Sequence, residues 1–175
     1  MANTFELIAS STVGAGGVAS ITFSSIPSTY TDLCLKLSLR SSNTAGSYDT
    51  VRILLNGNAT NISQMDLYGT GSGVGSEALG SPENNTILYT SNANNTANTF
   101  GNLEIYLPNY ANTSYAKTIS ADGVAENNAT ASIATLTAAL WDSTSAINSV
   151  QVTPYSGSYT FVQYSTAHLY GIKNS

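Results

Sequence analysis

Residues that commonly carry out enzyme chemistry are few in this chain. It contains one histidine, His168, and one cysteine, Cys34. A nucleophilic triad needs a base, yet no Gly-x-Ser-x-Gly motif occurs and no protease-like pattern surrounds Cys34. One histidine and one cysteine also cannot supply a zinc site. We therefore interpret His168 as a packing or surface residue and Cys34 as a small apolar strand residue, and we expect no catalytic residues.

Oxygen ligands offer two further kinds of chemistry. Calcium prefers hard oxygen donors, although the spacing here does not match an EF-hand loop. Glycoside hydrolysis needs two carboxylates at a fixed separation, which a sequence does not specify. Acidic residues near a predicted turn are common without any ligand, so we expect neither a metal nor a cofactor. The calcium candidates are Asp122, Glu126, Asn127 and Asn128, and the carboxylate candidates are Glu6, Glu104, Asp122 and Glu126.

Tyrosine is the most unusual residue type, because it occurs eleven times in 175 residues. Tyrosines on a sheet face can pair across strands within one chain. They can also lie at a protein–protein interface or stack on sugar rings, since the ring is apolar and its tip is polar. The sequence leaves cross-strand packing and an interface role equally open, with sugar binding behind them.

The composition excludes several classes of protein. Charged residues make up only 9% of the chain, whereas hydrophobic residues make up 42%, which is not the composition of a disordered protein. The net charge is −5 and the five basic residues form no cluster. This argues against partners such as nucleic acids and anionic membranes. A single cysteine cannot form an intrachain disulfide. We recognise no secretory signal at the N-terminus and no apolar window long enough to span a membrane.

Alternation with a period of two dominates the chain and predicts β-strands. It is clearest from Asp32 to Arg40, where Leu33, Leu35, Leu37 and Leu39 point to one face. The C-terminal run over residues 159–172 is the most β-branched and aromatic, so we expect it to be paired on both sides. Residues 131–141 are rich in Ala and Leu, but their alternation favours a strand over a helix. Other predicted strands cover residues 4–9, 18–23, 51–55, 65–68, 87–89, 103–107, 115–120 and 147–152.

Turn residues separate these strands. The first two strands are predicted to form an N-terminal hairpin, and Asn56-Gly57 and Asp122-Gly123 are predicted turns. Residues 69–85 and 91–98 are predicted loops, and the glycine-rich run Gly69–Gly75 lacks the lysine of a phosphate-binding loop. Gly171 predicts a bulge or a close backbone approach. Nine to eleven strands without a helical pattern predict an all-β fold: an antiparallel two-sheet sandwich of the jelly-roll type, with residues 1–175 as one domain.

Segments at both ends of the chain resemble virion structural proteins of tailed bacteriophages. In the C-terminal third, Trp141 to Val152 includes an I-x-S-[IV] strand, Gly157 to Phe161 forms a short turn before phenylalanine, and Ser165 to Ile172 matches S-x-x-x-L-Y-G-I. The stretch from Leu7 to Pro27 is similar to the first hairpin of the same proteins. These segments cover roughly half the chain, and the middle loops match no pattern that we recognise.

The resemblance implies a particle component and carries over no site residues. Such proteins are capsid decoration (cement) proteins, tail appendages or fibre modules, and they are typically β-rich, often trimeric and non-enzymatic. We therefore expect a homo-oligomer, most simply a trimer, that binds the phage major capsid protein. It would be located in the virion after assembly in the host bacterial cytoplasm. The alternative is a tail fibre or receptor-binding module that recognises host surface glycans through exposed tyrosines.

Overall fold

The computed structural model describes residues 4–80, 86–128 and 132–173, and this part of the chain is built from strands without a helix. These described residues contain twelve strands, and the pairings between them are antiparallel. In chain order they are β1 (Phe5–Thr12), β2 (Ile21–Phe23), β3 (Asp32–Leu39), β4 (Asp49–Leu55), β5 (Ile62–Gly69), β6 (Val74–Leu79), β7 (Thr86–Thr90), β8 (Gly101–Leu107), β9 (Lys117–Glu126), β10 (Ser132–Trp141), β11 (Val150–Pro154) and β12 (Thr166–Ile172).

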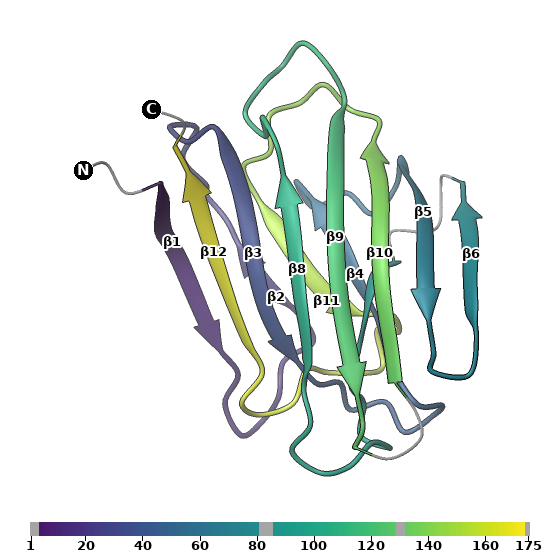
Figure 1. Ribbon diagram of the computed structural model, residues 1–175. Helices are drawn as coiled ribbons and strands as arrows, with labels where there is room; N and C mark the ends of the chain where they lie inside the picture. Colours follow the sequence, from purple (N-terminus) through teal and green to yellow (C-terminus); the bar gives the residue numbers. More distant parts are fainter. Residues whose placement is uncertain (1–3, 81–85, 129–131, 174–175) are drawn as a thin grey trace.

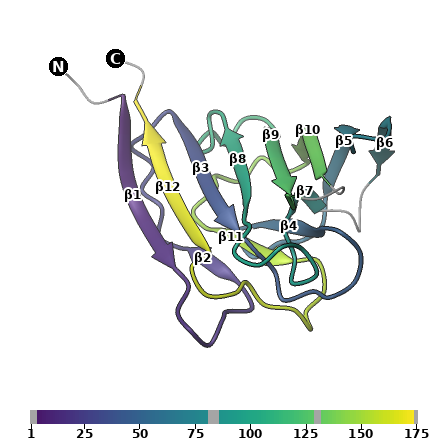
Figure 2. The same cartoon turned by 60° about the horizontal axis from the view of Figure 1, so that its bottom comes forward.

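These strands form two sheets that pack face to face. The larger sheet has eight strands in the order β1-β12-β3-β8-β9-β10-β5-β6, and the smaller has four in the order β2-β11-β4-β7. Figures 1 and 2 show the smaller sheet as a layer behind the larger one. Side chains from both sheets contribute to one hydrophobic core between the layers. The predicted antiparallel two-sheet sandwich is confirmed.

Eight of the strands follow the jelly-roll order. One half is β1-β12-β3-β8 and the other is β2-β11-β4-β7, so the first and last strands pair and the chain repeatedly crosses between layers. The remaining four strands are two insertions, β5–β6 after β4 and β9–β10 after β8. Both insertions add to the same edge of the larger sheet, beside β8. We call β9, β10, β5 and β6 the extension; β5 and β6 stand at the right-hand end in Figure 1.

Strand β3 supplies the centre of the core, as its alternation predicts. Leu33, Leu35, Leu37 and Leu39 are each no more than 2% exposed. Burial of such a side chain contributes roughly 1.5–3 kcal/mol before the entropy of ordering is subtracted. The strand is held in register by β12 on one side and β8 on the other.

The C-terminal strand is paired on both sides, by β1 and β3, which confirms the expectation for this run. It begins at Thr166, however, and not at residue 159. Before it, Phe161 makes isolated bridges to Val18 and Ser41 and is fully buried. This segment therefore fills the core without joining a ladder. Strand β2 likewise begins at Ile21, not residue 18, and β11 begins at Val150, not residue 147.

The predicted N-terminal hairpin is wrong. Strand β1 pairs with β12 in the larger sheet, whereas β2 pairs with β11 in the smaller one. A register shift between Leu7 and Ala9 also interrupts the alternation of inward and outward side chains along β1. Phe5 and Leu7 are both 53% exposed on the outer face, while Ile8 and Ala9 pack against the core. Local turn residues do not predict this pairing, because β1 and β12 lie at opposite ends of the sequence.

The predicted turn at Asp122-Gly123 is also wrong, because β9 runs without interruption from Lys117 to Glu126. Asp122 faces outward and Gly123 faces the core. A Cβ atom at Gly123 would lie 3.3 Å from side-chain atoms of Leu88 and Leu103. Gly123 thus provides space for the two leucines. By contrast, Asn56 and Gly57 do form a turn, with φ angles of 54° and 73°.

The predicted loop over residues 69–85 contains a strand. Strand β6 pairs with β5, and the hairpin is closed by the Thr70 N–H donating to the Gly73 carbonyl at 2.9 Å. Most β6 side chains are exposed, so no one-sided apolar pattern marks this strand in the sequence. Residues 81–85 lie outside the described residues. The strand predicted over 131–141 is confirmed from Ser132 onward, and residue 131 lies outside the described residues.

Gly171 allows an aromatic ring to approach the sheet, which accounts for the predicted close approach. A Cβ atom there would lie 2.3–2.6 Å from atoms of the Tyr30 ring. No register shift occurs at Gly171 in its pairing with β1 or β3. The glycine is therefore required by packing and not by a bulge.

Leu35→Ala should lower the free energy of unfolding by about 2–5 kcal/mol, because it leaves a cavity at the centre of the core. Urea denaturation followed by tryptophan fluorescence measures this change. The matched control is Leu7→Ala, whose side chain is exposed and should change stability by less than about 1 kcal/mol. Equal effects at both positions would contradict the assignment of the core.

Gly171→Ala should destabilise the protein by about 1–3 kcal/mol, because the added methyl group collides with the Tyr30 ring. The double variant Gly171→Ala with Tyr30→Ala should show a coupling free energy that recovers part of this loss. Gly157→Ala is the control, since no atom lies within 4 Å of its Cβ position. Purely additive losses in the double variant would argue against the collision.

Candidate functional site

The structure brings His168 and Cys34 onto neighbouring strands of the same sheet face. His168 pairs with Lys36, and Cys34 pairs with Tyr170, so the two side chains are diagonal neighbours. The Cys34 thiol is buried and donates to Glu104 Oε1 at 3.6 Å. Burial raises the pKa of Cys34, which disfavours the reactive thiolate. This arrangement agrees with a packing role for Cys34.

The predicted carboxylates are divided between two places. Glu6 accepts a hydrogen bond from Lys173 Nζ at 3.0 Å on the β1 edge. Glu104 pairs with Lys36 and stands opposite Asp122 across β8 and β9, on the outer face of the sheet. Glu126 lies further along β9 and is exposed. Only Glu104 and Asp122 are therefore neighbours, on a face that points toward solvent.

The calcium candidates do not converge into a metal site. Asp122 and Glu126 lie on the outer face of β9, and Asn127 and Asn128 follow the strand. The Asn128 N–H donates to Glu126 Oε1 at 2.9 Å, which is a local turn contact. Within the described residues, no group of three or more histidine, cysteine or acidic side chains could hold a metal ion.

Several tyrosines serve packing inside the chain. Tyr110 is fully buried and donates to the carbonyl of Pro27. Tyr106 donates to Asp32 Oδ2 at 2.7 Å, and this bond raises the pKa of Tyr106 to about 12. The rings of Tyr48 and Tyr89 meet edge to face at 5.1 Å. The exposed tyrosines are Tyr115, Tyr155 and Tyr164.

One of these, Tyr155, borders a hollow of about 320 Å³ on the outer face of the smaller sheet. The guanidinium carbon of Arg52 lies 5.9 Å from the centre of the Tyr155 ring. Gln151 also lines the hollow, and its Nε2 donates to Ser20 Oγ at 3.1 Å and to Thr22 Oγ1 at 2.8 Å. An aromatic ring beside oriented polar groups is the arrangement that a sugar ring needs.

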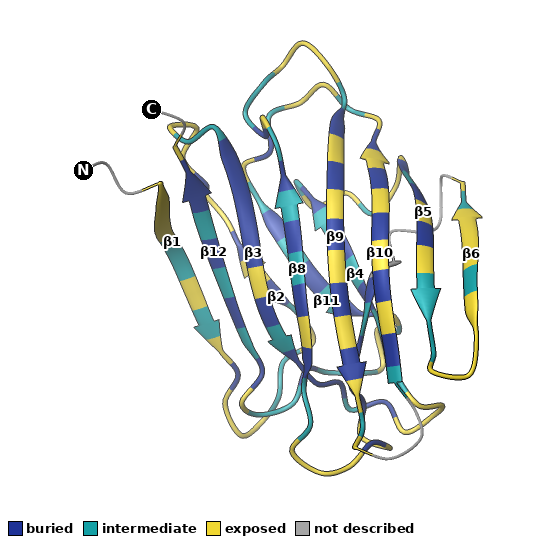
Figure 3. Ribbon diagram, in the orientation of Figure 1, coloured by how far each residue is buried: buried dark blue, intermediate teal, exposed yellow. Residues whose placement is uncertain are grey.

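A larger exposed region lies on the outer face of the extension, and sequence reasoning missed it. In β10, buried side chains on the inner face alternate with exposed apolar ones, as the banding of Figure 3 shows. Leu136, Met65 and Leu67 are each 54% exposed, and Val74 is 92% exposed. We call the whole set the apolar surface. Its members are Met65, Leu67, Val74, Ala78, Val124, Ala134, Leu136, Ala138 and Leu140.

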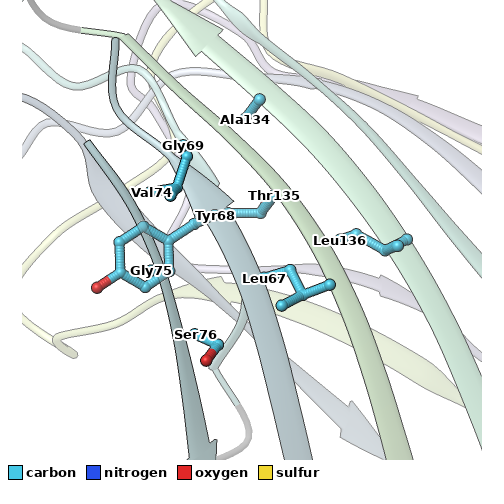
Figure 4. Close-up of a pocket in the computed structure, with 9 residues that line it drawn as sticks. All are labelled: Leu67, Tyr68, Gly69, Val74, Gly75, Ser76, Ala134, Thr135 and Leu136. Carbon is cyan, nitrogen blue, oxygen red and sulfur yellow. The ribbon is translucent and has the colours of Figure 1, made fainter. Parts of the chain in front are cut away.

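Strand register aligns these side chains in rows. Leu136 of β10 stands beside Leu67 of β5, and Ala138 stands beside Met65, which in turn neighbours Ala78 of β6. A hollow of about 660 Å³ lies across the three strands and is lined in part by Leu67 and Leu136 (Figure 4). A second hollow of about 480 Å³ continues along the same strands. The apolar surface is thus hollowed and not flat.

The outer face of the larger sheet has two chemically distinct halves. Nearer β12 it carries a polar row of His168, Lys36, Glu104 and Asp122, which register places side by side. The apolar surface continues from Leu136, the neighbour of Asp122, and contains no charged side chain. A contiguous apolar patch bordered by polar residues commonly marks an interaction site.

The loop over residues 91–98 is anchored by a buried arginine. Arg40 Nη1 donates to the carbonyls of Thr96 and Thr99 at 2.8 and 2.9 Å, and Nη2 donates to that of Asn95 at 3.0 Å. Burial lowers the pKa of Arg40. The backbone of this predicted loop is thus fixed from the inside.

Comparison with known proteins provides no family assignment. No protein-family model matches the chain, and no curated protein matches it. Among the described residues, no helix has the length and apolar character required to cross a membrane.

Arg40→Ala should destabilise the protein by about 1–3 kcal/mol, because three backbone carbonyls lose their donor. Amide hydrogen exchange should also become faster around residues 92–99, where the loop is held. Arg40→Lys should restore only part of this protection, since an ammonium group lacks the planar fork of the guanidinium. Lys36→Ala, which removes an exposed ion pair, is the control and should leave exchange in this loop unchanged.

Proposed function

We propose that this chain is a virion structural protein of a tailed bacteriophage, and more specifically a capsid decoration (cement) protein. It forms a homo-oligomer, a trimer in the simplest case, and binds the lattice of the major capsid protein. The role is structural and not catalytic. Assembly takes place in the host bacterial cytoplasm, and the protein remains in the virion. Neither nucleic acid nor a membrane is required as a partner.

The observation that carries this proposal is the apolar surface on the extension. Leaving Leu67, Leu136 and Met65 more than half exposed is unfavourable in water, and packing against another protein recovers the hydrophobic free energy. The absence of charge from this surface suits close contact, because no ion has to be desolvated on association. The end segments that resemble virion proteins, together with the jelly-roll sandwich, support the choice of a particle component.

The hollow beside Tyr155 favours a second candidate function, a tail fibre or receptor-binding module for host surface glycans. A sugar ring stacked on Tyr155 would be oriented by Gln151. A glycan array separates the two functions, because specific binding that is lost in Tyr155→Ala supports the receptor-binding module. The position of the protein in a low-resolution map of the particle, on the head or on the tail, decides between them.

Replacing Leu67 and Leu136 by glutamate should raise the protein concentration needed for assembly at least 100-fold, because two charges would be buried at the contact. Size-exclusion chromatography with light scattering measures the oligomer, and co-sedimentation with undecorated capsids measures binding. Far-UV circular dichroism should not change, since both side chains point away from the core. Ser10→Glu, an exposed outer-face position on β1, is the matched control. Wild-type-like assembly of the double variant would reject the apolar surface as the contact.

A further inference from the structure

Two carboxylates lie side by side on the inner face of the extension, opposite the apolar surface. Asp66 of β5 and Glu77 of β6 are directly paired across the strands. Side chains in such a pair have Cβ atoms only about 4.5–5.5 Å apart, and like charges there are destabilising. Asp66 is 2% exposed, whereas Glu77 is exposed to solvent. The pair therefore has one buried member and one member that solvent can reach.

Asp66 and its neighbour Gln64 each have a buried oxygen atom that accepts no hydrogen bond. Gln64 Nε2 donates to Asp66 Oδ2 at 3.0 Å, and the Thr137 hydroxyl also hydrogen-bonds to Asp66. Even so, Asp66 Oδ1 and Gln64 Oε1 are both buried and lack a hydrogen-bond partner in the structure. Gln64 is only 5% exposed. Buried acceptors of this kind are rare in folded proteins, because each loses its hydration without compensation.

The positive side chains of the protein are placed elsewhere. Lys36 pairs with Glu104 and Lys173 with Glu6, and these ion pairs of the described residues include neither Asp66 nor Glu77. Arg40 binds loop carbonyls, Lys117 Nζ donates to the carbonyls of Tyr115 and Thr144, and Arg52 lies over Tyr155. Burial raises the pKa of Asp66, and the charge of Glu77 adds to this shift. Within the described residues, no ion pair therefore supplies a counter-ion to this negative charge.

We propose that Asp66, Glu77 and Gln64 form a binding site for a divalent cation of the calcium type. All three supply hard oxygen donors, which calcium accepts in a flexible geometry, and water completes the coordination through the open side at Glu77. The site has two carboxylates, so its affinity falls in the weak range of about 10⁻⁴–10⁻³ M. A bound cation would link β5 to β6 and stabilise the outermost hairpin. The proposal does not depend on the role in a virion.

Thermal unfolding of the full chain in EDTA and in 10 mM calcium chloride tests the site. Calcium should raise the Tm of the wild-type protein by roughly 3–10 °C, the shift expected for an affinity in this range. Asp66→Asn and Glu77→Gln should each abolish the shift, and magnesium should produce a smaller one. Asp122→Asn, which removes an exposed carboxylate from the same sheet, is the control and should respond like the wild type.

Isothermal titration calorimetry with calcium chloride gives a second readout, in which the wild type should bind one ion and Glu77→Gln none. Because Glu77 is exposed, its variant folds normally and keeps the test decisive if Asp66→Asn fails to fold. Absence of binding heat in the wild-type protein overturns the proposal, and so does a calcium-induced rise in Tm that persists in both variants. The proposal is also overturned if the wild-type protein shows no response to calcium and Asp66→Asn has a higher Tm than the wild type. Asp66 then holds a proton and does not bind a cation.

Discussion

The burial of one face of β3 between the two sheets is the constraint on which the structure depends. Its four leucines lie under the smaller sheet, and its two neighbours, β12 and β8, come from distant parts of the chain. A slip of one residue in either pairing would turn all four leucines toward solvent. The hydrophobic contact between the layers therefore fixes the register of the central strands, and the jelly-roll crossings follow from it.

The extension depends on that central body but has different chemistry. Its two hairpins are separated in sequence, and β10 of the second insertion pairs with β5 of the first. Of the strands of the smaller sheet, β7 makes the main contacts with β9 and β10. The outer face of the extension points away from the smaller sheet and leaves its apolar side chains exposed, whereas the inner face encloses polar groups such as Asp66. The apolar surface and the proposed cation site therefore both lie on the strands added by the two insertions.

The sequence predicted elements well where one face is buried and the other is polar. The alternation of β3 and β8 indicated both the strand and the inner side chains, and Trp141 and Ile133 identified the inner face of β10. It could not predict the pairing of β1 with β12 or the strand β6, because the first is a long-range contact and the second is exposed on both faces. The apolar surface was missed for a related reason. Ala138 and Leu140 resemble core residues until the covering layer is known to lie on the opposite face of the sheet.

The two ends of the described chain lie together, which Figure 1 shows and which the bond from the Lys173 N–H to the Thr4 carbonyl at 3.0 Å fixes. Because β1 and β12 are antiparallel neighbours, Phe5 and Ile172 are opposite each other at the same end of the ladder. A force pulling these ends apart would break the ladder bonds one after another, starting at Phe5 and moving toward Thr12. Tension through the termini thus meets little resistance, and a strong anchorage has to be made through the sides of the sandwich.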